Sequence, residues 1–122
     1  MTNEQNSKTK KYDLEERTFE FAKRVRQVIR KLHKNIGNIE DGKQVIRSSG
    51  SVGANYIEAN EALSKKDFIM RVKISRKEAK ETRYWLNLID INNDPELEEE
   101  RQKLIQEVTE LMNIFGSIIR KV

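Results

Sequence analysis

Residues 47–89 read RSSGSVGANYIEANEALSKKDFIMRVKISRKEAKETRYWLNLI and decide the fold of this chain. The stretch has the apolar spacing of two long helices that meet at a short corner. Its first half contains Gly50 and Gly53, and each glycine costs a helix about 1 kcal/mol relative to alanine. The pair indicates either that another helix backbone approaches closely or that the helix is kinked or weakened here.

Apolar and small residues alternate in spacings of four and three through both halves, which places them on one face of each helix. In the first half this face contains Val45, Ser49, Val52, Tyr56, Ala59 and Leu63. Between the halves, Ser64 is a typical N-cap with Asp67 as its capping-box partner, and Leu63 and Phe68 occupy the positions of a hydrophobic staple. The spacing predicts helices over residues 40–63 and 65–91.

Two further helices are predicted outside this stretch. A capping box at Asp13 opens a helix over residues 13–36, and Gly37 suits a left-handed C-terminal cap. Asp94 as N-cap and Pro95 as first helical residue open a helix over residues 95–120.

The segment before the first helix and the start of the second are less regular. Residues 1–11 are polar, lysine-rich and without periodicity, which predicts a disordered tail. The second helix has two candidate caps, so it begins between Asn38 and Asp41. Residues 12–122 are predicted to form one domain, an all-α, antiparallel up-down-up-down four-helix bundle.

Composition narrows the class of protein. Among the 122 residues, 36% are hydrophobic and 36% charged, which suits amphipathic helices around a thin core. No cysteine is present, so disulfides and thiolate metal sites are excluded. The polar N-terminus lacks a secretory h-region, and no apolar run approaches the ~18 residues of a membrane span. We expect a cytoplasmic protein with no membrane partner.

The net charge of +4 is distributed in alternating segments. Residues 1–36 and 64–93 are basic, and residues 37–63 and 94–122 are acidic. Either oppositely charged helices lie side by side with solvated faces, or the basic segments form a surface for nucleic acid or an acidic partner. The candidate nucleic-acid-binding residues are Arg71, Lys73, Arg76, Lys77, Lys80, Lys23, Arg26 and Arg30.

The sequence gives little support for a catalytic site or a metal site. Glu58 and Glu61, and Glu78 and Glu81, are spaced three apart, but a di-iron bundle also needs Glu-x-x-His pairs. The only histidine, His33, has Arg30 three residues before it, and it is expected on the surface. We therefore predict no enzyme activity, metal or cofactor. The glutamates are expected to face water or to pair with cations: Arg71, Lys80 and Arg83.

Several residues are candidates for helix packing or assembly. They are small residues, an amide and two aromatic residues: Ser49, Gly50, Gly53, Asn55, Tyr56 and Trp85. Asn55 is expected to hydrogen-bond across helices, and Tyr56 to lie in the core with its hydroxyl at the edge. Trp85, beside Tyr84, is either an interface anchor or an ordinary core residue.

Three segments carry a resemblance to a known family: SGSVGANYIEA (49–59), SKKDFIMRVKIS (64–75) and KEAKETRYWLNLI (77–89). They resemble proteins first noticed as reading frames in intervening sequences of bacterial 23S ribosomal RNA genes. Accessory proteins of diversity-generating retroelements are related to that family. The resemblance implies a four-helix bundle that often forms a ring-like homopentamer. For the retroelement relatives it implies binding to nucleic acid and to a reverse transcriptase.

Two functions follow as hypotheses. The first is a non-catalytic oligomeric module, a homopentamer by resemblance, that binds RNA, DNA or a nucleic-acid-processing enzyme through a basic surface. The second is a protein-interaction scaffold with no nucleic-acid role, in which the small and aromatic residues mediate assembly and charge maintains solubility.

Overall fold

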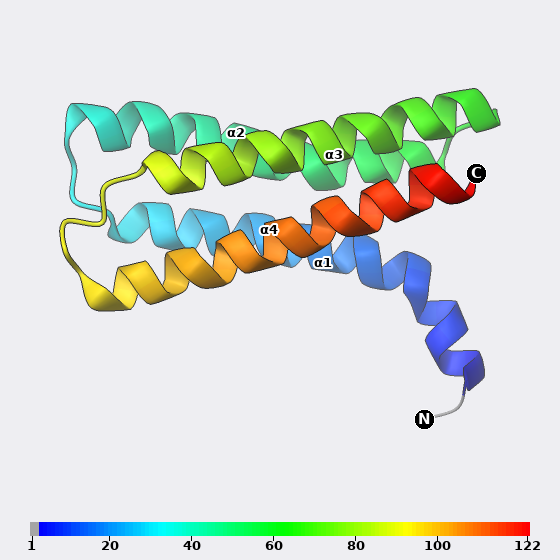
Figure 1. Cartoon of the computed structure of the whole chain (residues 1–122), viewed down its shortest axis with the longest axis horizontal. Helices are drawn as coiled ribbons and strands as arrows, with labels where there is room; N and C mark the ends of the chain where they lie inside the picture. Colours follow the sequence, from blue (N-terminus) through cyan, green and yellow to red (C-terminus); the bar gives the residue numbers. More distant parts are fainter. Residues whose placement is uncertain (1–2) are drawn as a thin grey trace.

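The computed structural model describes residues 3–122, with side chains described from residue 14 onward. It has four helices, α1 (Asn3–Lys31), α2 (Ile36–Asn60), α3 (Lys65–Leu88) and α4 (Pro95–Lys121). Successive helices run in opposite directions (Figure 1), so the predicted all-α, up-down-up-down four-helix bundle is confirmed. α1 begins at Asn3, so residues 3–11 belong to a helix instead of the predicted disordered tail, and residues 1–2 lie outside the described residues. The predicted capping box at Asp13 falls outside the residues with described side chains.

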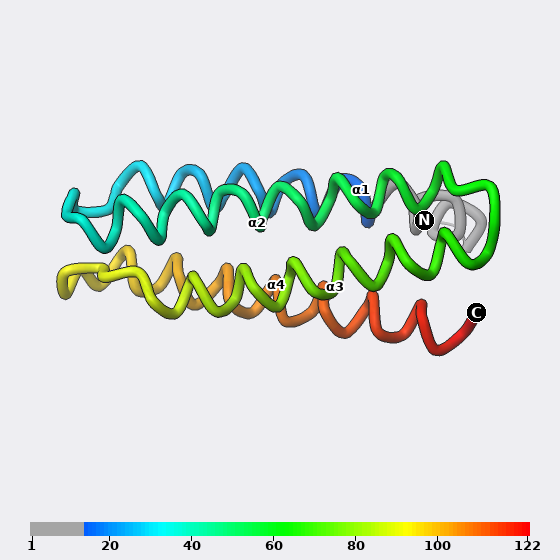
Figure 2. Tube along the Cα trace, turned by 90° about the horizontal axis from the view of Figure 1, so that it is seen from above, coloured from blue at the N-terminus to red at the C-terminus, as the bar shows by residue number. Residues whose placement is uncertain are grey.

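Each helix packs against two neighbours. α2 lies between α1 and α3, and α4 packs against both α3 and α1. Figure 2 shows α1 with α2 on one side of the bundle and α3 with α4 on the other. Within the described residues, α1 and α3 share no contacts and are therefore diagonal in the bundle.

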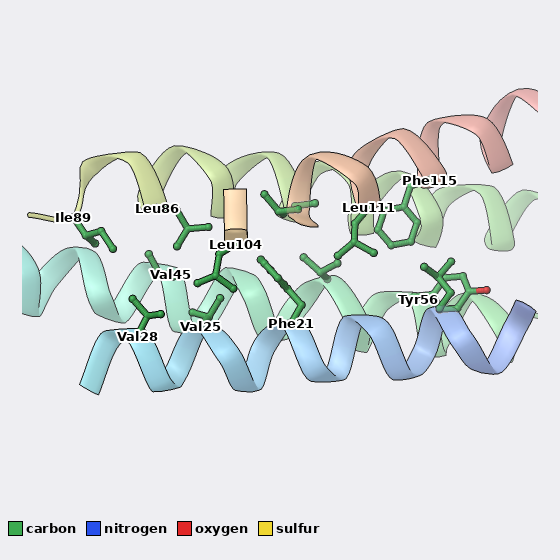
Figure 3. Close-up of a cluster of buried hydrophobic side chains, with 14 of the residues drawn as sticks. Phe21, Val25, Val28, Val45, Tyr56, Leu86, Ile89, Leu104, Leu111 and Phe115 are labelled. Carbon is green, nitrogen blue, oxygen red and sulfur yellow. The ribbon is translucent and has the colours of Figure 1, made fainter. Parts of the chain in front are cut away.

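The core runs along the centre of the bundle, where the apolar faces of all four helices meet. Phe21 of α1, Val45 of α2, Leu86 of α3 and Phe115 of α4 are fully buried members of this core (Figure 3). These faces follow the predicted spacings of three and four. None of the described helices combines the length and the apolar run that a bilayer crossing requires.

The connection between α1 and α2 differs from the prediction. α1 ends at Lys31 instead of residue 36, and α2 has Asn35 as its N-cap, ahead of both Asn38 and Asp41. The Oδ1 atom of Asn35 accepts a hydrogen bond from the main-chain N–H of Asn38 at 2.8 Å, which satisfies a free donor of the first turn. Gly37 consequently lies inside α2, and its predicted left-handed cap is wrong.

The corner between α2 and α3 confirms the predicted cap but not the staple. Ser64 Oγ accepts a hydrogen bond from the N–H of Asp67 at 3.1 Å. α2 ends at Asn60 instead of residue 63, because the chain must leave the helix for Ser64 to adopt the extended conformation of a cap. Leu63 is thereby fully exposed, at 101%, so it packs neither in the core nor against Phe68 as predicted.

At the connection between α3 and α4, α3 ends earlier than predicted, whereas α4 begins where predicted. α3 ends at Leu88 instead of residue 91, because the buried side chain of Asn38 binds the main-chain N–H and C=O of Asp90. Those groups are therefore not available to continue the helix. Asp94 then caps α4, and Pro95 is its first residue.

Candidate nucleic-acid interface

The small residues of α2 allow a close approach to α1. A Cβ atom on Gly53 would lie 2.7 Å from Thr18 Oγ1, which no real contact tolerates. A Cβ atom on Gly50 would meet only Arg26 Nη2, at an ordinary 3.6 Å. α2 is one helix through both glycines, so close packing explains Gly53, and Gly50 lies at the edge of that contact.

Asn55 and Tyr56 behave as the sequence predicts. Asn55 Oδ1 accepts a hydrogen bond from Arg71 Nη1 of α3 at 3.2 Å, while its amide nitrogen donates to Ser51 on its own helix. Tyr56 is buried, with its ring centroid 5.9 Å from that of Phe115. Figure 3 shows its hydroxyl directed away from the surrounding core side chains. These residues join α2 to α3 and α4.

Ser49 and Trp85 contribute to packing inside the protomer. Ser49 is fully buried, and its hydroxyl donates to the Ile46 carbonyl of the same helix. Trp85 is half-buried and packs against the core, as the ordinary-packing alternative predicts. Its indole ring meets the ring of Tyr84 nearly edge-on, with centroids 5.1 Å apart.

The acidic pairs do not converge on a common point. Glu78 is almost fully buried and accepts a hydrogen bond from Arg47 Nη1 at 3.2 Å, and Glu81 pairs with the same guanidinium at 3.4 Å. The cation is thus Arg47 of α2, not Arg71, Lys80 or Arg83 as predicted. Glu58 and Glu61 are exposed. Within the described residues, no three histidine, aspartate or glutamate side chains form a group that could hold a metal ion.

The candidate cations belong to two separate surfaces, because α1 and α3 are diagonal in the bundle. On α1, Arg26 donates to the carbonyl of Ala22, and the ammonium of Lys23 lies 5.6 Å from the centroid of the Phe19 ring. Arg30 is exposed. The bundle therefore does not combine the α1 and α3 residues into one surface within a protomer.

The candidate cations of α3 point in three directions. Arg71 bonds Asn55 of α2, and Arg76 leans toward α4, with its Nη1 4.0 Å from where a Gly116 Cβ would lie. Lys73, Lys77 and Lys80 are exposed and lie on the side of α3 opposite its buried residues. These three lysines form the centre of the candidate interface.

The line through these lysines extends in both directions at spacings of four, three, four, three and four. It contains Lys66, Met70, Lys73, Lys77, Lys80 and Tyr84, all exposed, and we call this set the α3 stripe. It is about 27 Å long at 1.5 Å per residue. Lys66 and Met70 were not among the residues predicted from the sequence, although the helical spacing of the central lysines continues through both of them.

The α3 stripe carries four lysines and no carboxylate. Some cations elsewhere in the described chain lie in ion pairs, among them Arg17 with Glu107 at 2.7 Å and Lys31 with Glu100 at 2.9 Å. No described carboxylate lies within 4.0 Å of a stripe lysine. The stripe is therefore a row of positive charge that the described residues do not neutralise.

Comparisons with known proteins give two findings. The family model of the 23S rRNA-intervening sequence protein matches residues 10–117. The chain is also similar to the crystal structure of a protein with unknown function from the S23 ribosomal protein family of Bacteroides thetaiotaomicron VPI-5482. That similarity has a TM-score of 0.73 and 31% sequence identity, and it covers 87% of this chain and 97% of the other.

A search of curated proteins gives no match. The family match nevertheless covers α2 and α3 in full, most of α1 and α4, and both halves of the segment that decides the fold. The chain belongs to the 23S rRNA-intervening sequence protein family.

Proposed function

We propose that this chain is a non-catalytic, cytoplasmic, homo-oligomeric module that binds nucleic acid through the α3 stripe. The observation that carries the proposal is the row of four exposed lysines without a carboxylate. Ammonium groups contact phosphates as mobile point charges, so such binding is electrostatic and tolerant of sequence. Because no stripe lysine pairs with a described carboxylate, the charge of the stripe is left for a polyanion.

We further propose that the module is a homopentamer, as the resemblance to its family implies. Five copies would present five stripes, and repetition converts weak single contacts into useful avidity. Light scattering should then give the mass of five 14.4 kDa chains, about 72 kDa. A nucleic-acid-processing enzyme is a candidate partner, because such an enzyme shares the nucleic acid as a common ligand.

The test is fluorescence anisotropy with labelled RNA over a range of salt concentrations. The triple variant Lys73→Glu, Lys77→Glu and Lys80→Glu reverses the centre of the stripe. Its matched control, Lys43→Glu, Lys103→Glu and Lys121→Glu, makes the same change in net charge at exposed positions on α2 and α4.

We expect the stripe variant to lose RNA binding and the control variant to retain most of it. For the wild-type protein, the logarithm of affinity should fall linearly with the logarithm of salt concentration, because bound lysines displace counterions. A second variant that only neutralises the three lysines, Lys73→Gln, Lys77→Gln and Lys80→Gln, should reduce that slope by about 2 to 3. Equal losses in both variants, or no binding by the wild-type protein at low salt, would contradict the proposal.

The alternative is a protein-interaction scaffold, and one observation favours it. A shallow, mostly apolar groove of ≈ 630 Å³ is lined by Lys65, Lys66, Ile69, Met70 and Lys73 at the start of α3. Such a surface suits an acidic partner with an apolar face. A protein partner that remains bound after nuclease treatment and is lost in Met70→Glu would favour this alternative.

A further inference from the structure

Tyr84 ends the α3 stripe with an exposed aromatic ring. Its side chain is 61% exposed and lies one helical turn beyond Lys80 on the same face. Trp85 meets the ring edge-on, with an angle of 81° between the ring planes, and Trp85 itself packs against the core. The Tyr84 hydroxyl makes no hydrogen bond to another described residue. The ring is thus supported from within the bundle and open to solvent outside it.

We infer that Tyr84 is a stacking platform for an unpaired base, so that the nucleic acid held by the α3 stripe is single-stranded at this position. This inference rests on the proposed function. It adds a class of ligand, because a row of lysines alone does not distinguish single strands from duplexes.

Every nucleobase has a π-face, so stacking on an aromatic side chain adds affinity without requiring a particular sequence. A base inside a duplex is stacked between its neighbours and cannot cover the ring of Tyr84 without being unpaired first. One helical turn, about 6 Å of axial rise, separates Tyr84 from Lys80, so a nucleotide whose phosphate contacts Lys80 can place its base on the ring.

Phe19 of α1 provides a matched comparison. Its side chain is exposed to the same extent, 61%, but the ammonium of its own neighbour Lys23 lies 5.6 Å from its ring centroid. Glu16 and Glu20 are exposed on the same helix, close to the ring in sequence. Tyr84 also has a carboxylate close in sequence, Glu81, but that carboxylate pairs with Arg47 at 3.4 Å. Phe19 thus combines an exposed ring with mixed local charge, whereas Tyr84 combines one with a row of lysines that has no carboxylate partner among the described residues.

The experiment measures the affinities of the full chain for single-stranded oligouridine of about 15 nucleotides and for an RNA duplex of equal length. The variants are Tyr84→Ala, which removes the ring, Tyr84→Phe, which keeps it, and Phe19→Ala as the control. Circular dichroism melting of each variant establishes that the fold is retained before affinities are compared.

We expect Tyr84→Ala to weaken single-strand binding by about fivefold or more and to leave duplex binding within about twofold. Tyr84→Phe and Phe19→Ala should both bind oligouridine like the wild-type protein. Unchanged oligouridine affinity in Tyr84→Ala, or equal loss for both RNAs, would overturn the stacking inference while the charge-based proposal stands. A wild-type protein that binds neither RNA would overturn the proposed function itself.

Discussion

The side chain of Asn38 is hydrogen-bonded in both directions to the main chain of Asp90, 52 residues further along the chain. Asn38 Nδ2 donates to the Asp90 carbonyl at 2.8 Å, and Asn38 Oδ1 accepts from the Asp90 N–H at 2.8 Å. The same Nδ2 also donates to the carbonyl of His33 at 2.9 Å. One buried amide therefore joins the α1–α2 connection to the end of α3.

Asn38→Ala should destabilise the fold by about 2 kcal/mol, because it leaves main-chain groups of Asp90 and His33 without partners in a buried site. Urea unfolding followed by circular dichroism measures the loss. Asn87→Ala is the matched control, since its exposed amide bonds only to Arg83 on the same helix. The control should change stability by less than about 0.5 kcal/mol. Similar losses in the two variants would show that the Asn38 hydrogen bonds stabilise the fold no more than an exposed bond within one helix does.

The two glycines of α2 should respond to alanine with opposite signs. Gly53→Ala places a methyl group 2.7 Å from Thr18 Oγ1, and the overpacking cost, within a range of about 1–3 kcal/mol, should exceed the helix-propensity gain of about 1 kcal/mol and destabilise the protein. Gly50→Ala meets its nearest side-chain atom at 3.6 Å, so the propensity gain should dominate and stabilise the protein. Thermal melting of both variants checks the pair. Destabilisation by the same amount at both positions would contradict the packing argument.

The helices themselves could be predicted from spacing, whereas several of their ends could not. Asn35, Asn38 and Asp41 can each cap a helix, and local sequence does not rank them. The outcome depends on Asp90, which uses the side chain of Asn38 and leaves the cap to Asn35. Leu63 fits the apolar spacing of α2, but the conformation required at the Ser64 cap ends the helix before it.

Some features of the candidate interface could likewise be predicted from the sequence, and others could not. The spacing of Lys73, Lys77 and Lys80 places them on one face of any helix, so this part was predictable. The partner of Glu78 was not, because Arg47 reaches it across the α2–α3 contact. The separation of the α1 cations from the α3 stripe follows from the order of helices in the bundle, because the described part of α1 packs against α2 and α4 and not against α3.

The ion pair between Arg47 and Glu78 should contribute more than an exposed pair. Only 9% of the Glu78 side chain is exposed, so removing the guanidinium leaves a nearly buried carboxylate unpaired. A double-mutant cycle of Arg47→Ala and Glu78→Ala should give a coupling energy of about 1 kcal/mol or more. The corresponding cycle for the exposed pair of Lys43 and Glu40 should give about 0.3 kcal/mol. Equal coupling energies would show that burial of Glu78 does not strengthen the pair.

Tyr56 should make stability fall at high pH. Burial raises the pKa of its phenol above the ordinary value of about 10, and the negative charge of Glu15 raises it further, while the Asn60 side chain opposes the shift. The unfolded chain therefore loses the phenol proton first, so the contribution is complete below about pH 10 and is lost as pH rises through the folded-state pKa. Tyr56→Phe removes this contribution. The difference in unfolding free energy between wild-type and Tyr56→Phe should be constant from about pH 7 to pH 9 and should shift in favour of Tyr56→Phe above about pH 10.

Urea unfolding of both proteins across this range measures the difference, in which the titration of lysines common to both chains cancels. A constant difference up to about pH 11 would mean that the phenol of Tyr56 titrates as it does in the unfolded chain.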